Sequence, residues 1–319
     1  MSIDTRAERQ PVSLDWAGCP LCGEFSAKPW VRAPDRFHGR RIPYELVRCG
    51  GCGLVWLLDP PLTTEMPSHY DQTYHDLIEK AGETEIQRRW SRERSTILNF
   101  RTGGALLDIG CNSGAFLRAL KGPGWQLHGV EISPEEARKA RTSAGADVFV
   151  GDPLEAPYQP ESFDVITCFH TLEHVYQPRE LLRKILIWLR PGGILYLTLP
   201  NIDSWEASIF RSYWYGLELP RHLFHFSPSS LERATEAVHL RTIKLETRDT
   251  FSEHSLHYVF EVLARFWGMP MANLAAGGSA PVAVKALRKL FRLSIEALFR
   301  YTASAAGRGA AIEGVFTRD

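Results

Sequence analysis

Four cysteines stand in two closely spaced pairs near the start of the chain, Cys19-Pro-Leu-Cys22 and Cys49-Gly-Gly-Cys52. In such a pair the first thiolate can bind a metal ion, the chain then turns, and a following glycine lets backbone N–H groups face sulfur. Four thiolates satisfy a tetrahedral Zn²⁺ ion and leave no coordination position open. The pairs therefore predict a structural zinc site formed by Cys19, Cys22, Cys49 and Cys52.

The alternative for these cysteines is a set of two redox-active motifs. That alternative is weaker because neither pair precedes a helical pattern, as a thioredoxin-like motif would. Two short strands, 25–32 and 44–48, are expected between the pairs instead, which is typical of a zinc ribbon. A segment of this size buries too little surface to fold alone, so the metal is expected to stabilise it.

A second group of residues suits a nucleoside ligand. Residues 105–116 are Ala-Leu-Leu-Asp-Ile-Gly-Cys-Asn-Ser-Gly-Ala-Phe, which predicts a buried strand, a tight turn from Gly110 to Gly114, and the start of a helix. Small residues let the backbone approach a ligand closely, and the first N–H groups of the helix point toward it. The turn therefore favours a nucleotide or nucleoside cofactor.

Acidic residues follow the next two expected strands. Glu131 ends the second strand, and Asp152 follows the third. In an open α/β sheet, a carboxylate at the tip of the second strand can accept hydrogen bonds from both ribose hydroxyls. The carboxylate of Asp152 is placed to accept from the exocyclic amine of adenine.

Alternating strands and helices must position these groups. The expected strands are 105–109, 126–130, 147–150, 163–169 and 194–199, and the expected helices between them are 115–121, 134–143 and 178–189. Such alternation predicts an α/β fold with a parallel sheet covered on both faces and with ligands at the carboxyl ends of the strands. A further helix at 228–238 and strands at 242–247 and 310–317 follow.

Together these motifs resemble the class I S-adenosylmethionine (SAM)-dependent methyltransferases over about residues 105–247. The segments that carry the resemblance are Leu-Asp-Ile-Gly-Cys-Asn-Ser-Gly from 107, Val-Glu-Ile-Ser from 130, Gly-Asp from 151, Phe-Asp-Val-Ile from 163, Leu-Glu-His-Val from 172 and Leu-Arg-Pro-Gly-Gly from 189. The resemblance implies a Rossmann-like, doubly wound, mostly parallel seven-stranded sheet. A small N-terminal zinc ribbon with four cysteine ligands and a helical C-terminal insertion are expected beside it.

The resemblance also implies a set of cofactor-binding residues. The turn would border the methionine part of SAM, Glu131 the ribose, Asp152 the adenine, and the fourth strand's end one edge of the site. The implied set is Asp108, Gly110, Cys111, Asn112, Gly114, Glu131, Ile132, Asp152, Phe169 and His170. Many relatives have glycine where this chain has Asn112, but asparagine tolerates left-handed backbone. A dinucleotide-binding dehydrogenase is disfavoured because the central glycine of Gly-x-Gly-x-x-Gly is missing.

Histidines supply the candidate bases for methyl transfer. The sulfonium of SAM already activates its methyl group, so the protein must orient a nucleophile and, where needed, remove its proton. The segment 214–228 contains Pro-Arg-His-Leu-Phe-His-Phe-Ser, and neutral histidine accepts protons near pH 7. We rank His222 first as base or substrate orienter, His170 second and His225 third. Alternatively, His222 and His225 only tie their loop to the following helix.

The expected reaction is methylation of a small molecule, at a hydroxyl or carbon of a sugar or related metabolite. This follows from a resemblance to methyltransferases of polysaccharide and natural-product pathways. RNA methylation through the zinc ribbon and a non-catalytic cofactor-binding or interaction role are the alternatives. With 37 basic and 37 acidic residues, no global charge recruits nucleic acid. The one basic cluster of the ribbon comprises Arg32, Arg36, Arg40, Arg41 and Arg48.

The sequence divides into five expected parts. These are a leader and zinc ribbon at 1–58, a helical connector or lid at 59–100, the SAM-binding core at 101–250, a helical insertion at 251–306 and a final strand at 307–319. The basic amphipathic pattern within 256–301 fits a cap over the site, a dimer contact or peripheral membrane contact. No secretory leader or long apolar run is seen, so a cytoplasmic enzyme is expected. The sequence does not select an oligomeric state.

Overall fold

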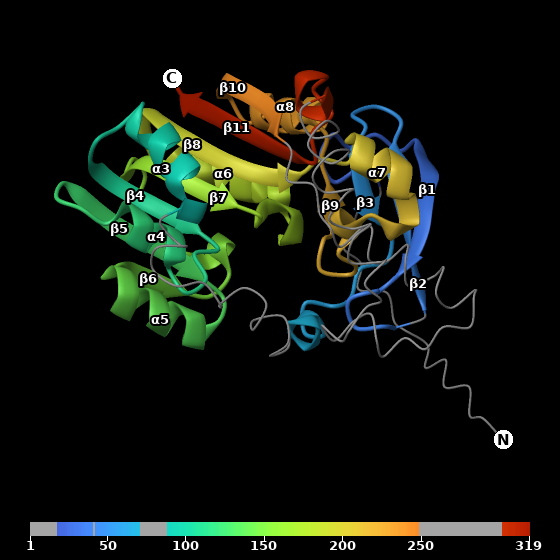
Figure 1. Cartoon of the computed structure of the whole chain (residues 1–319), viewed down its shortest axis with the longest axis horizontal. Coiled ribbons are helices and arrows are strands. Elements are labelled where there is room, and N and C mark those ends of the chain that lie inside the picture. The colour runs from blue at the N-terminus through green and yellow to red at the C-terminus, as the bar shows by residue number, and fades with distance from the viewer. Residues whose placement is uncertain (1–17, 41, 71–87, 249–301) are drawn as a thin grey trace, which may run out of the picture.

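The computed structural model describes residues 18–40, 42–70, 88–248 and 302–319 (Figure 1). The amphipathic helices expected within 256–301 and the leader at 1–17 lie outside these residues. So does the first part of the connector helix expected at 84–100, of which the structure describes α3 (Ser91–Leu98). No helix within the described ranges is long and apolar enough to span a bilayer.

A seven-stranded sheet forms the larger body of the molecule, on the left in Figure 1. Its strand order is β10-β11-β8-β7-β4-β5-β6, and β11 alone runs antiparallel to its neighbours. The strands are β4 (Gly104–Ile109), β5 (Trp125–Glu131), β6 (Asp147–Val150), β7 (Phe163–Phe169), β8 (Leu189–Pro200), β10 (Leu240–Arg248) and β11 (Ala311–Arg318). The predicted α/β, doubly wound and mostly parallel sheet is confirmed.

Alternation along the strands sends side chains into two separate cores. On β4, Leu106 packs into one apolar cluster and Leu107 into the other, as the two-residue period of a strand requires. One face is covered by α3, α4 (Ala115–Leu120) and α5 (Pro134–Ala144), and the other by α6 (Pro178–Trp188) and α8 (Pro228–Glu236). Each fully buried leucine or isoleucine contributes about 1.5–3 kcal/mol to folding.

Local signals explain where these helices start and stop. The hydroxyl of Ser133 caps α5 by accepting from the N–H of Glu136, and Gly145 ends the helix in the left-handed conformation. A capping box at Ser227 and Ser230, with Pro228 in the first turn, starts α8. Capped ends fix the helix lengths and thereby place the loops at the carboxyl ends of the strands.

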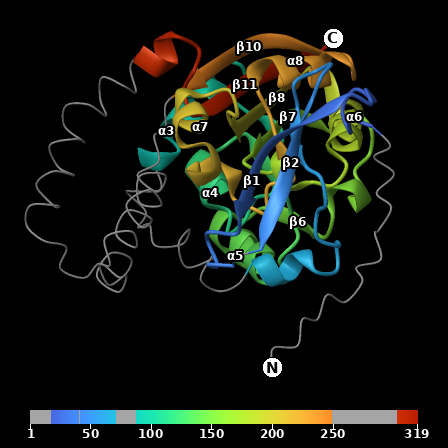
Figure 2. The same cartoon turned by 90° about the vertical axis from the view of Figure 1, so that its right-hand side faces the viewer.

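The cysteine-containing segment forms a second, four-stranded antiparallel sheet, seen edge-on at the right of Figure 1 and from its outer side in Figure 2. Its strands are β1 (Ala27–Pro34), β2 (Pro43–Cys49), β3 (Val55–Leu57) and β9 (Phe224–His225). The strand β9 comes from the loop after β8, and it pairs Phe224 with Trp56. The ribbon and the candidate substrate loop are therefore parts of one sheet.

Several short elements join these two bodies. They are η1 (Met66–His69), η2 (Pro153–Glu155), η3 (Leu172–His174), α7 (Trp205–Phe210), η4 (Arg211–Tyr213) and η5 (Tyr215–Leu217). Most follow the carboxyl ends of parallel strands, where ligands bind in open α/β sheets.

Candidate functional site

The turn after β4 has the backbone that the sequence pattern requires. Gly110, Asn112 and Gly114 all have left-handed φ angles, 75°, 48° and 77°. A Cβ at Gly114 would lie 2.8 Å from the Cα of Ala140, so a side chain there would collide with α5. The asparagine in place of the usual central glycine is thus held in the conformation that it tolerates better than most residues. The turn Gly110–Gly114, called the cradle below, therefore presents mainly backbone atoms at the edge of the sheet.

Glu131 connects this cradle to the tip of β5. Its two carboxylate oxygens accept hydrogen bonds from the backbone N–H groups of Asn112 and Ser133, each at 2.9 Å. Each oxygen retains a second lone pair, which suits the paired hydroxyls of a ribose. Burial raises the pKa of Glu131, while these N–H groups oppose that rise.

Asp108 lies beneath the turn. It is buried on β4 and accepts a 2.7 Å hydrogen bond from the hydroxyl of Thr167 on β7. Burial raises its pKa to about 7, although the Thr167 hydrogen bond lowers it. Asp108 therefore ties β4 to β7 directly below the cradle, where a positive charge on a ligand would favour its ionised form.

Ile132 and Asp152 extend the cradle toward β6. Ile132 is 71% exposed next to Glu131, although it is a large apolar side chain. Asp152 is exposed and accepts from the N–H of Leu154 at 2.8 Å with one oxygen. An apolar surface beside a carboxylate fits the face and the amine of a purine base. The residues present thus match the parts of SAM in their chemistry.

Two other expected cofactor residues lie under the cradle. Phe169 packs against Phe116, Trp90 and Tyr196, with ring centroids 4.9–5.6 Å apart. Cys111 is buried, and its sulfur lies only 2.6 Å from the position that a Cβ on Gly129 would take. In this structure their side chains support the turn from the core.

His170 projects from the carboxyl end of β7. Its φ is 50°, and its side chain is 51% exposed. Its Nδ1 lies 3.6 Å from Oε1 of Glu173, whose carboxylate is fully buried and accepts no hydrogen bond from the described residues. Burial raises the pKa of Glu173, but the contact with His170 and the charge of His222 outweigh it and lower the pKa. A carboxylate behind a solvent-facing imidazole is the arrangement of a histidine base.

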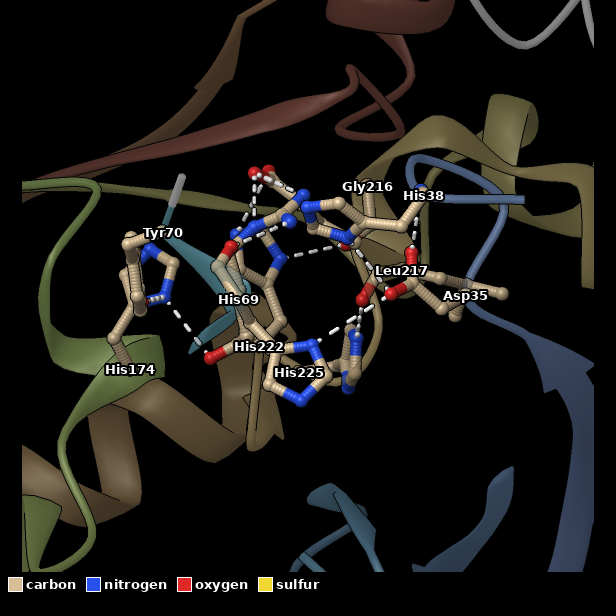
Figure 3. A network of polar contacts seen from close by, with 11 residues as sticks. Asp35, His38, His69, Tyr70, His174, Gly216, Leu217, His222 and His225 are labelled. Atoms are coloured by element: carbon tan, nitrogen blue, oxygen red, sulfur yellow. Dashed lines mark hydrogen bonds and ion pairs between the residues drawn. The ribbon is translucent and has the colours of Figure 1, made fainter. Parts of the chain in front are cut away.

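His222 is buried among acceptors (Figure 3). Its Nε2 lies 3.2 Å from Oε2 of Glu218, and its Nδ1 lies 2.9 Å from the carbonyl oxygen of Gly216. Burial lowers the pKa of His222, yet the Glu218 carboxylate outweighs it and raises the pKa. Since both nitrogens face acceptors, His222 is held as an imidazolium that donates both protons.

The neighbouring histidines are held neutral. Burial and the charge of His222 lower the pKa of His174 to about 4 and that of His225 to about 3. Nδ1 of His174 lies 3.0 Å from the hydroxyl of Tyr70 and 3.0 Å from the carbonyl oxygen of Arg221. Nε2 of His225 lies 3.1 Å from the carbonyl oxygen of Leu217. His225 therefore fastens the loop, and its Nδ1 has no hydrogen-bond partner in the described part of the chain.

Glu173, His174 and His222 also offer donor atoms within 4.8 Å of one another, as a metal centre would. We interpret them as a charge network because both nitrogens of His222 already face Glu218 and Gly216. The sequence interpretation leaves out Glu218. Its signal was the spacing from Glu218 to Arg221 and His222, which brings all three together in one tight turn.

The four cysteines converge as expected. The sulfur atoms of Cys19 and Cys52 lie 3.5 Å apart, as do those of Cys22 and Cys49, and all four lie within 4.8 Å of one another. A tetrahedron with Zn–S bonds near ~2.3 Å separates its sulfurs by about 3.8 Å. The N–H groups of Gly51 and Cys52 also point to the sulfur of Cys49, at 3.3 and 3.4 Å. This donor set suits a tetrahedral thiolate-bound ion.

Comparisons with known proteins agree with this geometry. Residues 83–245 match a family model described as a methyltransferase domain. The chain is similar to the ubiquinone biosynthesis O-methyltransferase of Idiomarina loihiensis, with 32% identity over 155 residues, 45% of this chain and 64% of that protein. It is similarly related to the protein of that name from Xanthomonas campestris, at 31% over 159 residues. The chain thus spans 64% of the length of these curated relatives.

Solved structures share the fold. A SAM-dependent methyltransferase from Thermotoga maritima, described as a possible histamine N-methyltransferase, gives a TM-score of 0.52 at 18% identity, covering 80% of this chain and all of that one. One from Archaeoglobus fulgidus gives 0.51 at 21%, covering 76% and 99%. At these identities the likeness concerns the fold alone. The family match covers half of the chain, and this protein therefore belongs to the class I SAM-dependent methyltransferases.

Proposed function

We propose that this methyltransferase acts on a small molecule and methylates a hydroxyl group. The relatives named above are O-methyltransferases, which supports an oxygen nucleophile over the carbon that the sequence also allowed. A sugar or related metabolite stays a candidate acceptor. What carries the proposal is the pair of His170 and Glu173 at the end of β7, beside the cofactor cradle.

RNA methylation has less support. Three arginines of the ribbon's basic cluster pair with carboxylates of the same chain: Arg32 with Glu45, Arg40 with Asp35, and Arg48 with Asp203. Arginines that already pair with carboxylates of the same chain are less available to RNA phosphates. The affinity of a protein for a phosphate backbone depends on accessible cations. Arg41 lies outside the described residues.

The cradle residues would hold SAM, which supplies a methyl group on a positively charged sulfur when bound. Gly110 and Gly114 would leave room for the methionine part, and Glu131 would accept from the ribose hydroxyls. Asp152 and Ile132 would contact the adenine, while Asp108 places a carboxylate beneath the turn. Phe169 and Cys111 keep the cradle rigid from the core side.

His170 accepts the proton of the acceptor hydroxyl, and Glu173 stabilises the resulting imidazolium. The geometry favours His170 over His222 for this step because His222 has no ring nitrogen turned away from an acceptor. His222 instead acts as a fixed cation that keeps Glu218 and Glu173 ionised. His225 holds the same loop through Leu217.

Zinc would occupy the Cys19, Cys22, Cys49 and Cys52 site. It would stabilise the ribbon and take no part in the reaction, since four thiolates leave no position for substrate.

Replacing His170 tests the function. We expect His170→Ala to lower kcat by about 10²–10⁴-fold, the usual contribution of a general base. The affinity for S-adenosylhomocysteine, measured by titration calorimetry, should change far less. His239→Ala, in the exposed turn between α8 and β10 and at a left-handed φ like that of His170, is the matched control and should keep full turnover. Unchanged turnover in His170→Ala would remove this residue from the mechanism.

A further inference from the structure

The proposed base stands in an unusual backbone conformation. His170 directly follows β7 and has a φ of 50°, yet its N–H still donates to the carbonyl oxygen of Thr198 on β8 at 2.9 Å. Left-handed backbone is unfavourable for a residue with a Cβ, and it persists where neighbouring contacts hold it. The contacts around His170 therefore determine the position of its imidazole.

Thr171 makes two of those contacts. Its hydroxyl donates to the carbonyl oxygen of Phe169 at 3.1 Å, which closes a small turn around His170. Its own carbonyl oxygen accepts from the N–H of His174 at 3.0 Å. Thr171 is thus bonded both to the residue before the base and to η3, which carries Glu173.

The side chain of Thr171 also lies against the cradle. In the sheet, Cys168 of β7 is opposite Ile109 of β4, so the segments that follow these two strands are neighbours (Figure 1). A Cβ on Gly110 would collide with the Oγ1 of Thr171 and would lie 2.9 Å from its Cγ2. The threonine side chain therefore fills the space beside the first residue of the cradle.

One side chain thus connects the cradle to the proposed base. Methyl transfer requires the acceptor oxygen to meet the base and the methyl donor at the same time, so the base has to lie at a fixed distance from the cradle. Glu173 orients the ring of His170, whereas the hydroxyl of Thr171 fixes the backbone that carries the ring.

We propose that Thr171 is a positioning residue, which holds His170 in its left-handed conformation and sets its distance from the cradle. The inference rests on the proposed function, because Thr171 acts through His170. It assigns the hydroxyl of Thr171 to the base and the branched shape of its side chain to the contact with Gly110.

Two variants separate the hydroxyl from the shape. Thr171→Val keeps a branched side chain and loses the hydroxyl, while Thr171→Ser keeps the hydroxyl. Crystal structures of both variants with S-adenosylhomocysteine report the φ of His170 and need no methyl acceptor. We expect His170 to leave the left-handed region in Thr171→Val and to retain it in Thr171→Ser.

Turnover with SAM, with catechol as the hydroxyl probe, measures the consequence for the reaction. Thr171→Val should lower kcat by about 10–100-fold and change the affinity for S-adenosylhomocysteine by less than about twofold, since the cradle contact is kept. Thr171→Ser should retain kcat within about threefold, because the hydroxyl is kept.

Thr142→Val is the matched control. The hydroxyl of Thr142, on the exposed side of α5, likewise donates to a backbone carbonyl oxygen, that of Arg138 at 3.0 Å. Its loss should leave turnover, the affinity for S-adenosylhomocysteine and the φ of His170 unchanged.

Three results would overturn the proposal: an unchanged φ of His170 in Thr171→Val, full turnover in that variant, or a loss of cofactor affinity as large as the loss of kcat. The variant His170→Ala separates this failure from that of the proposed function. If His170→Ala loses turnover and Thr171→Val does not, the positioning role fails while the proposed base stands.

Discussion

Of the three neighbouring histidines His174, His222 and His225, only His222 is charged. His222 and Glu218 form a buried ion pair, while His174 and His225 stay neutral about 5–6 Å away, as Figure 3 lets the reader follow. One charged imidazole suppresses ionisation of its neighbours, because like charges repel strongly where water is excluded. The network therefore fixes which histidines carry protons near neutral pH.

The lowered pKa of His225 makes stability depend on pH. Its pKa falls from 6.5 to about 3 on folding, so the neutral folded form is favoured above about 6.5. As the pH falls below that value, the unfolded chain takes up a proton that the folded chain does not. We expect this residue alone to lower the free energy of unfolding by about 1.4 kcal/mol per pH unit.

Urea unfolding of the wild type and of His225→Gln at pH 7.5, 6 and 5 measures this effect. The stability difference between the two proteins should shrink as the pH falls, because only the wild type loses the contribution of His225. A difference that stays constant over this range would contradict the neutral assignment.

At the scale of elements, the turn between β4 and α4 determines the cradle. Gly114 combines a left-handed φ of 77° with close contact to Ala140 of α5. Gly145 has a similar φ of 70°, but a Cβ there would meet only the end of Lys121, 3.6 Å away. A side chain at Gly145 would therefore introduce backbone strain alone, whereas a side chain at Gly114 would also collide with α5.

Alanine at each glycine tests that separation. Gly145→Ala should cost about 1 kcal/mol of stability and leave cofactor affinity intact. Gly114→Ala should cost more than that and should weaken S-adenosylhomocysteine binding, because α5 or the turn must move. Thermal unfolding and titration calorimetry give both quantities. Equal losses in the two variants would show that contact with Ala140 is unimportant.

Much of this arrangement could be predicted from the sequence. The parallel strands are buried apolar runs that end in glycine or acid, so β4 and β7 were located to within one residue. The turn with Asn112 and the cysteine cluster were also expected, since both depend on local spacing. The strand β9 was missed because two residues show no periodicity, and its pairing with β3 joins segments far apart in sequence. The ion pair of His222 with Glu218 was also missed, although the two residues lie only four positions apart.

Across the whole molecule, the ribbon and the methyltransferase core are joined by strand pairing within one sheet. Val55 of β3 pairs with His225 of β9, and the N–H of Leu57 donates to the carbonyl oxygen of Leu223 at 2.9 Å. The loop that contains His222 therefore leaves the core, joins the ribbon sheet and returns to α8. Loss of the ribbon should disturb the acceptor side of the site and spare the cofactor cradle, which β4 and β5 build.

Removing the proposed zinc ion tests this connection. Cys52→Ser should lose the metal, expected at about one ion per chain and measured by elemental mass spectrometry. It should also lose methyl transfer while S-adenosylhomocysteine binding persists. Cys168→Ala changes a buried cysteine of β7 outside the cluster and should retain the metal. Full zinc content in Cys52→Ser would refute the four-thiolate site.

The central claim is that SAM binds on the cradle formed by Gly110–Gly114 and Glu131. Titration of S-adenosylhomocysteine into the wild type, Glu131→Gln and Glu135→Gln tests it most directly, with circular dichroism to establish that each variant is folded. The account predicts binding to the wild type and to Glu135→Gln, whose carboxylate lies on the outer side of α5. It predicts at least about tenfold weaker binding to folded Glu131→Gln, which loses charged acceptors for the ribose. Wild-type affinity in Glu131→Gln would contradict it.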